Sequence, residues 1–103
     1  MSTSIVMTTC KDEKEAMRIA DSVLSKKLAA CVKMSDAKTS YWWNGKVERS
    51  EEAILSVMTP KKNVAKVMAE IKKVHSYDTP EIVEIPVLKG DKKYMRWISD
   101  VTE

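Results

Sequence analysis

The feature that most constrains this chain is an Asn-Gly pair inside a long run of β-forming residues. Asn44-Gly45 is preceded by Tyr41-Trp42-Trp43 and followed by Lys46-Val47-Glu48. A type I′ turn needs positive φ at both central residues, and Asn-Gly adopts that conformation readily. The pair therefore predicts a β-hairpin with arms that run from Ala29 to Met58. This is about twice the length that a compact sheet needs, so the tip is expected to project beyond the domain.

Before the hairpin, the sequence indicates one strand and one helix. Residues Ile5–Cys10 are rich in β-formers and end in polar residues, which is typical of a strand. Asp12 and Glu15 have the spacing of a capping box, in which side-chain oxygens bind the free amides at a helix start. Apolar residues at helical spacing follow, and the helix is expected to end near Lys26-Lys27. Residues Leu28–Met34 then predict the first arm of the hairpin.

After the hairpin, a second helix and a last strand are indicated. Thr59-Pro60 matches an N-cap followed by proline at the first helical position, and apolar residues at helical spacing continue to Val74. Residues Glu81–Leu88 predict a strand at a sheet edge or bulge, because Pro86 cannot donate to a ladder. A short closing helix follows, with these residues expected on its buried side: Tyr94, Trp97, Ile98 and Val101.

The resulting order is β-α-β-β-α-β followed by a short C-terminal helix. This is the α+β, ferredoxin-like arrangement, in which both long helices cover one face of a four-stranded antiparallel sheet. Residues 1–103 have room for one domain and not two. Many unrelated activities share this fold, so function has to be argued from the side chains.

Composition excludes several classes of function. The 18 Lys and Arg are nearly balanced by 15 Asp and Glu, for a net charge of +3, and only three of the 18 are Arg. This argues against nucleic acid as a partner, because Arg is the preferred residue for phosphate and base contacts. No apolar run approaches the roughly 20 residues that span a bilayer. With no signal-peptide pattern at the N-terminus and no disulfide framework, a cytoplasmic protein is expected.

The residues that bear chemistry suggest coordination rather than catalysis. His75 is the only histidine, and from the pattern alone it fits a partly buried histidine near a helix C-terminus, just as Cys10 and Cys31 fit small buried apolar residues. The alternative is that the three residues together form a site for a soft metal. No nucleophile elbow, Ser-His-Asp order or phosphate loop is present, so no enzymatic activity is expected. A hydrolase that uses His75 with Asp78 is disfavoured, because no nucleophile accompanies the pair.

Four motifs identify a family. Residues Lys27–Val32, Ser40–Lys46, His75–Ile82 and Tyr94–Ile98 resemble, in order and separation, the CutA divalent-cation tolerance family over about residues 4–101. The resemblance implies a PII-like homotrimer whose long hairpins pair with neighbouring subunits, and no established catalysis. It also implies a role in the response to metal ions, copper in particular. Copper or another divalent cation would be bound reversibly and would not be required for folding.

The resemblance also implies site residues. Tyr41, Trp43, Tyr77, Glu81 and Trp97 would outline a cleft between subunits, and the metal ligands would be His75, Cys31 and Cys10. In some bacterial members one Cys and two adjacent His bind copper. Those positions here are Thr8, Val74 and His75. The alternative is a trimeric signalling or scaffold module that binds a small anion or a protein at the cleft, with no direct metal role.

The aromatic composition fits such interfaces. The chain has three Trp, three Tyr and no Phe, so every aromatic ring carries a polar group. Rings of this kind are favoured at interfaces and clefts, where one end is buried and the other is wet. All six lie in the segments that the resemblance assigns to the trimer and its clefts.

Overall fold

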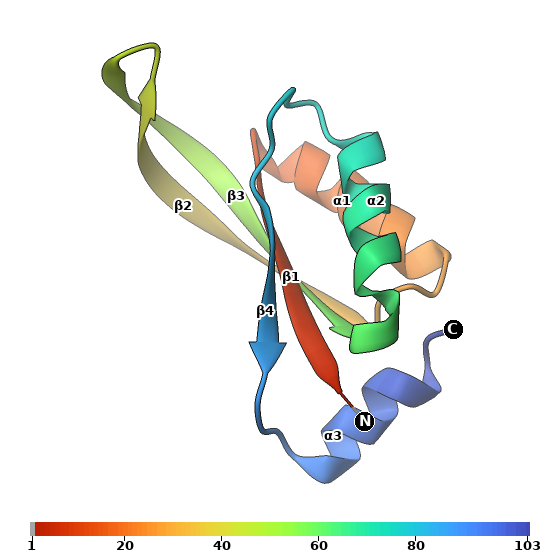
Figure 1. Ribbon diagram of the computed structural model, residues 1–103. Coiled ribbons are helices and arrows are strands. Elements are labelled where there is room, and N and C mark those ends of the chain that lie inside the picture. The colour runs from red at the N-terminus through yellow and green to blue at the C-terminus, as the bar shows by residue number, and fades with distance from the viewer. Residues whose placement is uncertain (1) are drawn as a thin grey trace.

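The computed structural model describes residues 2–103 and has the predicted order of elements (Figure 1). The four strands and two long helices follow the expected β-α-β-β-α-β order. A one-turn 3₁₀ helix precedes the second long helix. The elements are β1 (Thr3–Cys10), α1 (Glu13–Ser25), β2 (Cys31–Trp43), β3 (Lys46–Pro60), η1 (Lys61–Asn63), α2 (Val64–Val74), β4 (Ile82–Val87) and α3 (Lys92–Asp100).

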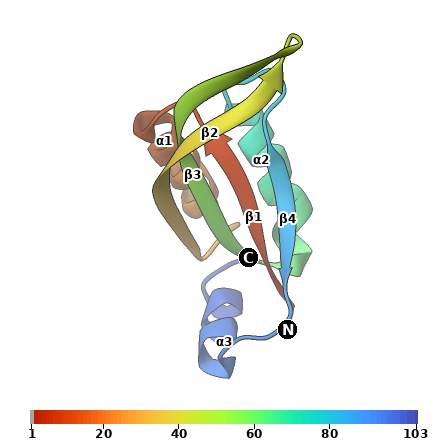
Figure 2. The ribbon, with the colours of Figure 1, turned by 90° about the vertical axis from the view of Figure 1, so that its left-hand side faces the viewer.

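The four strands form one antiparallel sheet in the order β2-β3-β1-β4. Helices α1 and α2 lie side by side on one face of it, which confirms the ferredoxin-like α+β prediction (Figures 1 and 2). The core fills the space between helices and sheet, because each element turns its apolar stripe inward. Its fully buried members include Val6, Ile19, Val23, Leu55, Val57, Val67 and Ile71.

The hairpin is the most prominent feature outside this core. Asn44 has φ 50° and Gly45 has φ 76°, so both central residues of the turn adopt the predicted positive φ. Pairing between β2 and β3 is unbroken from Cys31–Met58 to Trp43–Lys46, whereas β1 pairs with β3 only from Ala53 onward. The hairpin tip, between Ala53 and the turn, therefore extends past one end of the sheet, while the last helix lies at the other end (Figure 1). The longest dimension of the molecule is 45 Å.

No helix or loop of residues 2–103 covers the sheet face opposite the helices. Ile5 and Met7 of β1 are half-buried there, and Val83 and Ile85 of β4 are 41% and 40% exposed. The strands β2 and β4 are the two edges, and Pro86 lies in the edge strand β4 as predicted. We call this surface the open face.

The helix start expected at Thr59-Pro60 is wrong. Both residues belong to β3, because they pair with Ser4 and Thr3 of β1. The Thr59 hydroxyl donates to the Leu28 carbonyl oxygen (2.6 Å) rather than capping a helix. Helix α2 begins only at Val64, with no side-chain cap.

Two other expectations need correction. Strand β2 begins at Cys31 rather than Leu28, because Lys27 adopts a positive φ of 55° and turns the chain, so that Leu28 and Ala29 enter the core. On α3 only Ile98 is buried, while Trp97 and Val101 remain 43% and 40% exposed. The helix lies beyond one end of the sheet, where it covers little surface (Figure 2).

Candidate functional site

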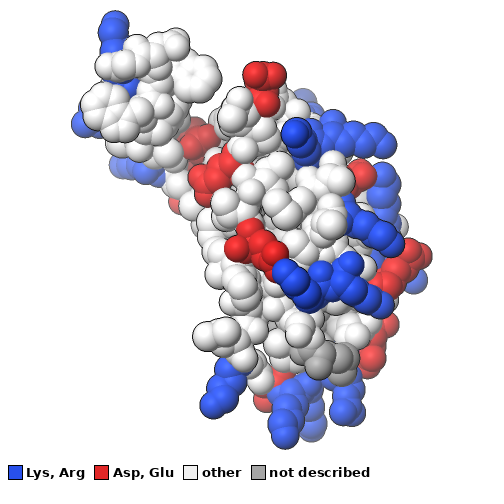
Figure 3. All heavy atoms as spheres, viewed as in Figure 1, with Lys and Arg blue, Asp and Glu red and all other residues white. Residues whose placement is uncertain are grey.

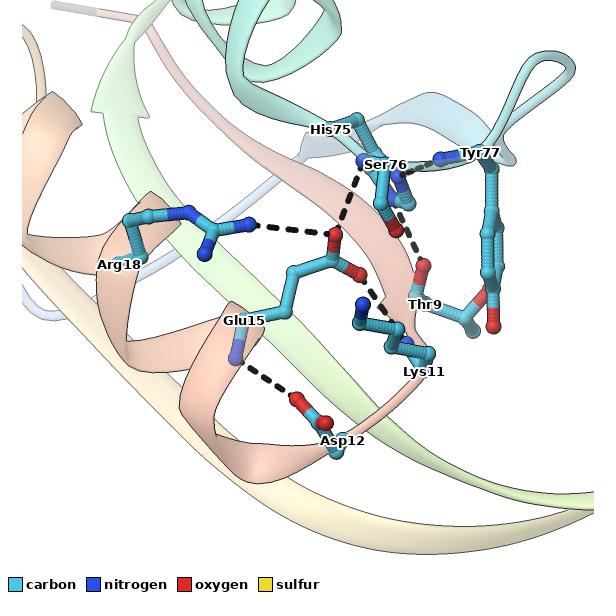
Figure 4. A network of polar contacts seen from close by, with 8 residues as sticks. All are labelled: Thr9, Lys11, Asp12, Glu15, Arg18, His75, Ser76 and Tyr77. Carbon is cyan, nitrogen blue, oxygen red and sulfur yellow. Dashed lines mark hydrogen bonds and ion pairs between the residues drawn. The ribbon is translucent and has the colours of Figure 1, made fainter.

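Three segments meet where β1 ends: the first turn of α1, the end of β1, and the loop that follows α2 (Figure 4). Here Cys10 Sγ, a carboxylate oxygen of Glu15 and a ring nitrogen of His75 all lie within 4.8 Å of one another. We call these residues the Cys10–Glu15–His75 cluster. The structure thus brings together two of the three residues proposed as metal ligands and adds a carboxylate.

Both ring nitrogens of His75 are engaged. Nε2 lies 2.9 Å from the carbonyl oxygen of Thr9, and Nδ1 accepts a hydrogen bond from the Tyr77 amide (3.2 Å). A carbonyl only accepts and an amide N–H only donates, so these partners assign a neutral ring with its proton on Nε2. A metal at His75 would have to replace one of the two contacts.

Glu15 joins the three segments through its carboxylate. Oε1 accepts from the Lys11 amide (3.1 Å), Oε2 accepts from the Ser76 amide (2.9 Å), and the Arg18 guanidinium lies 3.6 Å from Oε2. Burial opposes ionisation of this side chain, which is 1% exposed, but the hydrogen bonds from Ser76 and Lys11 outweigh it. They hold the pKa of Glu15 below its usual value. The site therefore contains a buried negative charge.

The predicted capping box is present in modified form. Asp12 accepts from the Glu15 amide (2.8 Å), as an N-cap should. The Glu15 carboxylate, however, binds the amide of Lys11 rather than that of Asp12. This displacement lets the same side chain also reach Ser76 in the loop after α2.

Cys10 is fully buried beneath this network. Burial raises the pKa of its thiol to about 11, and the nearby Glu15 and Glu52 carboxylates add to the effect. The thiol is therefore protonated at neutral pH. Because the thiolate is the metal-binding form, coordination here would release a proton.

Cys31 does not join the cluster. It pairs with Met58 of β3 whereas Cys10 pairs with Ala53, so the two lie about 17 Å apart along that strand. Residues five apart on one strand face opposite sides of a sheet, which places Cys31 on the open face.

Thr8 and Val74 stand at two positions of the bacterial copper-ligand pattern, and both have apolar surroundings. Val74 packs against the core. Thr8 is fully buried, and its hydroxyl has no hydrogen-bond partner among residues 2–103. Neither side chain supplies the thiolate or imidazole that this pattern would require.

A groove lies on the other side of β1, between the hairpin and the loop after α2. Its volume is about 630 Å³, and four of the five predicted cleft residues line it: Tyr41, Trp43, Tyr77 and Glu81. We call it the hairpin groove. The fifth, Trp97, is on α3, where its ring stacks on that of Tyr94 at a centroid distance of 5.9 Å.

Tyr77 connects the hairpin groove to the cluster. Its hydroxyl donates to Glu52 Oε2 on β3 (2.8 Å), while its amide donates to His75 and its ring lies 4.9 Å from the imidazole. Burial and the bond to Glu52 both raise the pKa of the phenol, so it stays protonated. One residue thus contacts both candidate sites.

Sequence reasoning did not assign a site role to Glu15 or Glu52. Glu15 gave only a capping signal, and its second role depends on a loop that lies 61 residues away. For Glu52 a signal existed. Counting residues back from the Asn44-Gly45 turn pairs Glu52 with Ala37, on the hairpin face that also carries Tyr41 and Trp43.

Known proteins resemble this chain over almost its whole length. Residues 4–101 match the family described as CutA1 divalent ion tolerance protein. The divalent-cation tolerance protein CutA of Archaeoglobus fulgidus is 40% identical over 100 residues, which are 97% of this chain and 98% of that protein.

Solved structures share the fold of this chain over almost its whole length. That of the periplasmic divalent cation tolerance protein CutA from A. fulgidus has a TM-score of 0.96, over 98% of this chain and 99% of that one. That of CutA1 from Oryza sativa is 32% identical with a TM-score of 0.95, over 100% and 95% of the two chains. Sequence and fold therefore point to one family.

Proposed function

This chain belongs to the CutA1 divalent ion tolerance family, and on that premise we propose that it binds a divalent cation, copper in particular, reversibly in the response to metal ions. The single observation that carries the proposal is the convergence of three ligand atoms within 4.8 Å in the Cys10–Glu15–His75 cluster. A thiolate, an imidazole and a carboxylate suit copper or zinc better than magnesium or calcium.

The surroundings of the cluster suit exchangeable binding better than a permanent metal centre. Each of the three groups must first lose something: Cys10 a proton, His75 one hydrogen bond, and Glu15 at least part of its contact with two amides. These costs lower the affinity and make it rise with pH. The core closes without a metal, and we propose that folding requires none. Coordination, not turnover, is the proposed activity.

The test is metal titration of protein that has first been stripped with a chelator. Zn²⁺ and Cu²⁺ are added in separate calorimetric titrations. His75→Ala and Cys10→Ser should each lower the association constant at least tenfold, because each removes one of three ligands. Cys31→Ser is the matched control and should bind as wild type does. Equal binding by His75→Ala and wild type would refute the assignment.

A second function is favoured by the hairpin groove. Because both His75 nitrogens are already engaged, the family's link to metals could be indirect, with a small ligand bound at the groove. In this alternative the chain acts as a trimeric signalling or scaffold module. Tyr77 then serves ligand binding rather than the positioning of His75.

We propose a cytoplasmic location on the grounds that the two cysteines are too far apart to pair, so the chain lacks the disulfides on which small secreted domains depend. None of the helices in the described part of the chain is long and apolar enough to cross a membrane. The A. fulgidus relative is described as periplasmic, so cell fractionation with an antibody to this chain is the relevant test. Recovery in the periplasm would contradict the proposal.

A further inference from the structure

We propose that the hairpin groove binds a small organic ammonium cation. This inference rests on the second proposed function, ligand binding at the groove, and it does not depend on a metal in the Cys10–Glu15–His75 cluster. It replaces the small anion expected from sequence by a ligand of opposite charge. Three properties of the groove carry it: charge, aromatic walls and a fixed width.

The charge of the groove is strongly unbalanced. Among the described residues that line it, Lys11 is the only basic one, against four acidic ones, Glu51, Glu52, Asp78 and Glu81. Within residues 2–103, none of these four carboxylates takes part in an ion pair. A hollow lined by one sign of charge concentrates ligands of the other sign and repels its own.

Figure 3 shows acidic side chains below the hairpin tip, where the hairpin meets the rest of the molecule. The basic residues of the two hairpin strands, Lys33, Lys38, Lys46 and Arg49, are not among those that line the groove. The negative charge is therefore local to the groove, although the whole chain carries a net charge of +3. An anionic ligand would meet an unfavourable potential there.

The walls of the groove are aromatic. Tyr41 and Trp43 are two residues apart on β2, so their rings project from the same face of the hairpin, and they are 41% and 57% exposed. Tyr77 forms the opposite wall from the loop after α2. Aromatic faces attract alkylammonium groups, and nearby carboxylates add to that attraction. A bare metal ion would use the carboxylates but gain little from the rings.

A hydrogen bond also joins the two walls of the groove. The Tyr77 hydroxyl donates to Glu52 Oε2, which ties the loop after α2 to the hairpin and sets the distance between the two walls. Oε1 of Glu52 accepts no hydrogen bond among the described residues, so it can accept an N–H of a ligand. The volume of about 630 Å³ lies in the range of small-molecule sites.

The experiment compares two probes of equal size and opposite charge at pH 7: phenethylammonium and 3-phenylpropanoate. Each is titrated into the intact protein in its native oligomeric state, by calorimetry and by tryptophan fluorescence. We expect the ammonium to bind at least tenfold more tightly than the carboxylate. Its association constant should fall as salt is raised from about 0.02 to 0.5 M, because exposed charges are screened.

Matched variants locate the site. Trp43→Leu should weaken phenethylammonium binding about threefold, from the loss of a cation–π contact at an exposed site, whereas Trp42→Leu should leave it unchanged. The double variant Asp78→Asn with Glu81→Gln should weaken it about tenfold, whereas Asp100→Asn should have no effect. The side chains chosen for change are exposed, so the variants are expected to fold.

The outcomes distinguish two claims: that the groove binds a small ligand, and that this ligand is a cation. If 3-phenylpropanoate binds to the wild type and Trp43→Leu abolishes that binding, the groove is still a ligand site but the ligand is not a cation. Binding of neither probe, or a neighbouring copy of the chain filling the groove, would overturn both. Metal binding in the cluster is measured separately and is unaffected by either result.

Discussion

At the scale of single residues, one buried carboxylate organises the candidate site. Glu15 holds the Lys11 and Ser76 amides, so it fixes both the start of α1 and the loop that carries His75 (Figure 4). Glu15→Gln keeps the shape of the side chain but leaves one amide without an acceptor. We expect the free energy of unfolding at pH 7 to fall by about 1–3 kcal/mol, the usual effect of a buried group without a partner.

The pH dependence of this loss has a defined sign. The pKa of Glu15 is lower in the folded than in the unfolded chain, so its stabilisation is present above the unfolded pKa of about 4.3 and disappears as the pH falls through the folded pKa. Urea unfolding of wild type and Glu15→Gln should therefore differ at pH 7 and converge in acid. Glu13→Gln, exposed on α1, is the control. A gap that persists undiminished at low pH would contradict this role.

The two cysteines should differ sharply in reactivity. The Cys10 thiol is fully buried with its pKa raised to about 11, whereas Cys31 is only half-buried on the open face. At pH 8 roughly one Cys10 in a thousand is a thiolate, so iodoacetamide should not label Cys10 in the native protein, whereas Cys31 should react wherever the open face is uncovered. Mass spectrometry of peptides identifies the labelled residue. Denatured protein, in which both sites should react, is the control, and native labelling of Cys10 would contradict the burial.

At the scale of elements, the hairpin depends on a turn whose positive φ angles few residue types adopt. Gly45 has φ 76°, and apart from its two chain neighbours no heavy atom of the described residues lies within 4 Å of the point that a Cβ would occupy, so a larger residue there would suffer backbone strain rather than a clash. Gly45→Ala should cost about 1 kcal/mol, because residues with a Cβ disfavour the left-handed region. Thermal unfolding at fixed protein concentration measures it. Asn44→Gly should be tolerated, and equal losses in the two variants would contradict the account.

At the scale of the whole molecule, the open face and the hairpin tip lack covering partners in the single chain, as far as residues 2–103 show. Val83 and Ile85 are about 40% exposed on the open face, and Trp42 at the tip is 76% exposed. Exposed apolar surfaces of this kind are typical of protein–protein interfaces. We therefore expect a homotrimer, with a mass by light scattering about three times the 11.7 kDa of the chain.

A charged residue on the open face should disrupt that assembly. Ile85→Glu places a carboxylate in the apolar surface, and we expect it to shift the mass toward that of one chain. Leu24→Glu, at a residue on α1 that is also partly exposed, is the control and should leave the mass unchanged. A mass near 12 kDa for the wild type would contradict the trimer.

The order of the elements, the hairpin with its turn, and the family with its fold could all be predicted from the amino-acid sequence. These features depend on periodicity and turn chemistry within a few residues, which a sequence displays directly. The groove residues on the hairpin could be grouped for the same reason, since a register counted from Asn44-Gly45 places Tyr41, Trp43 and Glu52 on one face.

Which chemical groups meet could not be predicted from the sequence, because it depends on contacts between residues far apart in the chain. The contact of Glu15 with Ser76 spans 61 residues and that of His75 with Thr9 spans 66, and each depends on how α1 and α2 pack on the sheet. The same packing keeps Thr59 in β3, against its local helix-capping signal, because its hydroxyl binds Leu28. It also separates Cys31 from Cys10. Where strand pairing and burial act together, they contribute more to stability than the capping or turn propensity of a single residue. Long-range packing therefore outweighs local preference there.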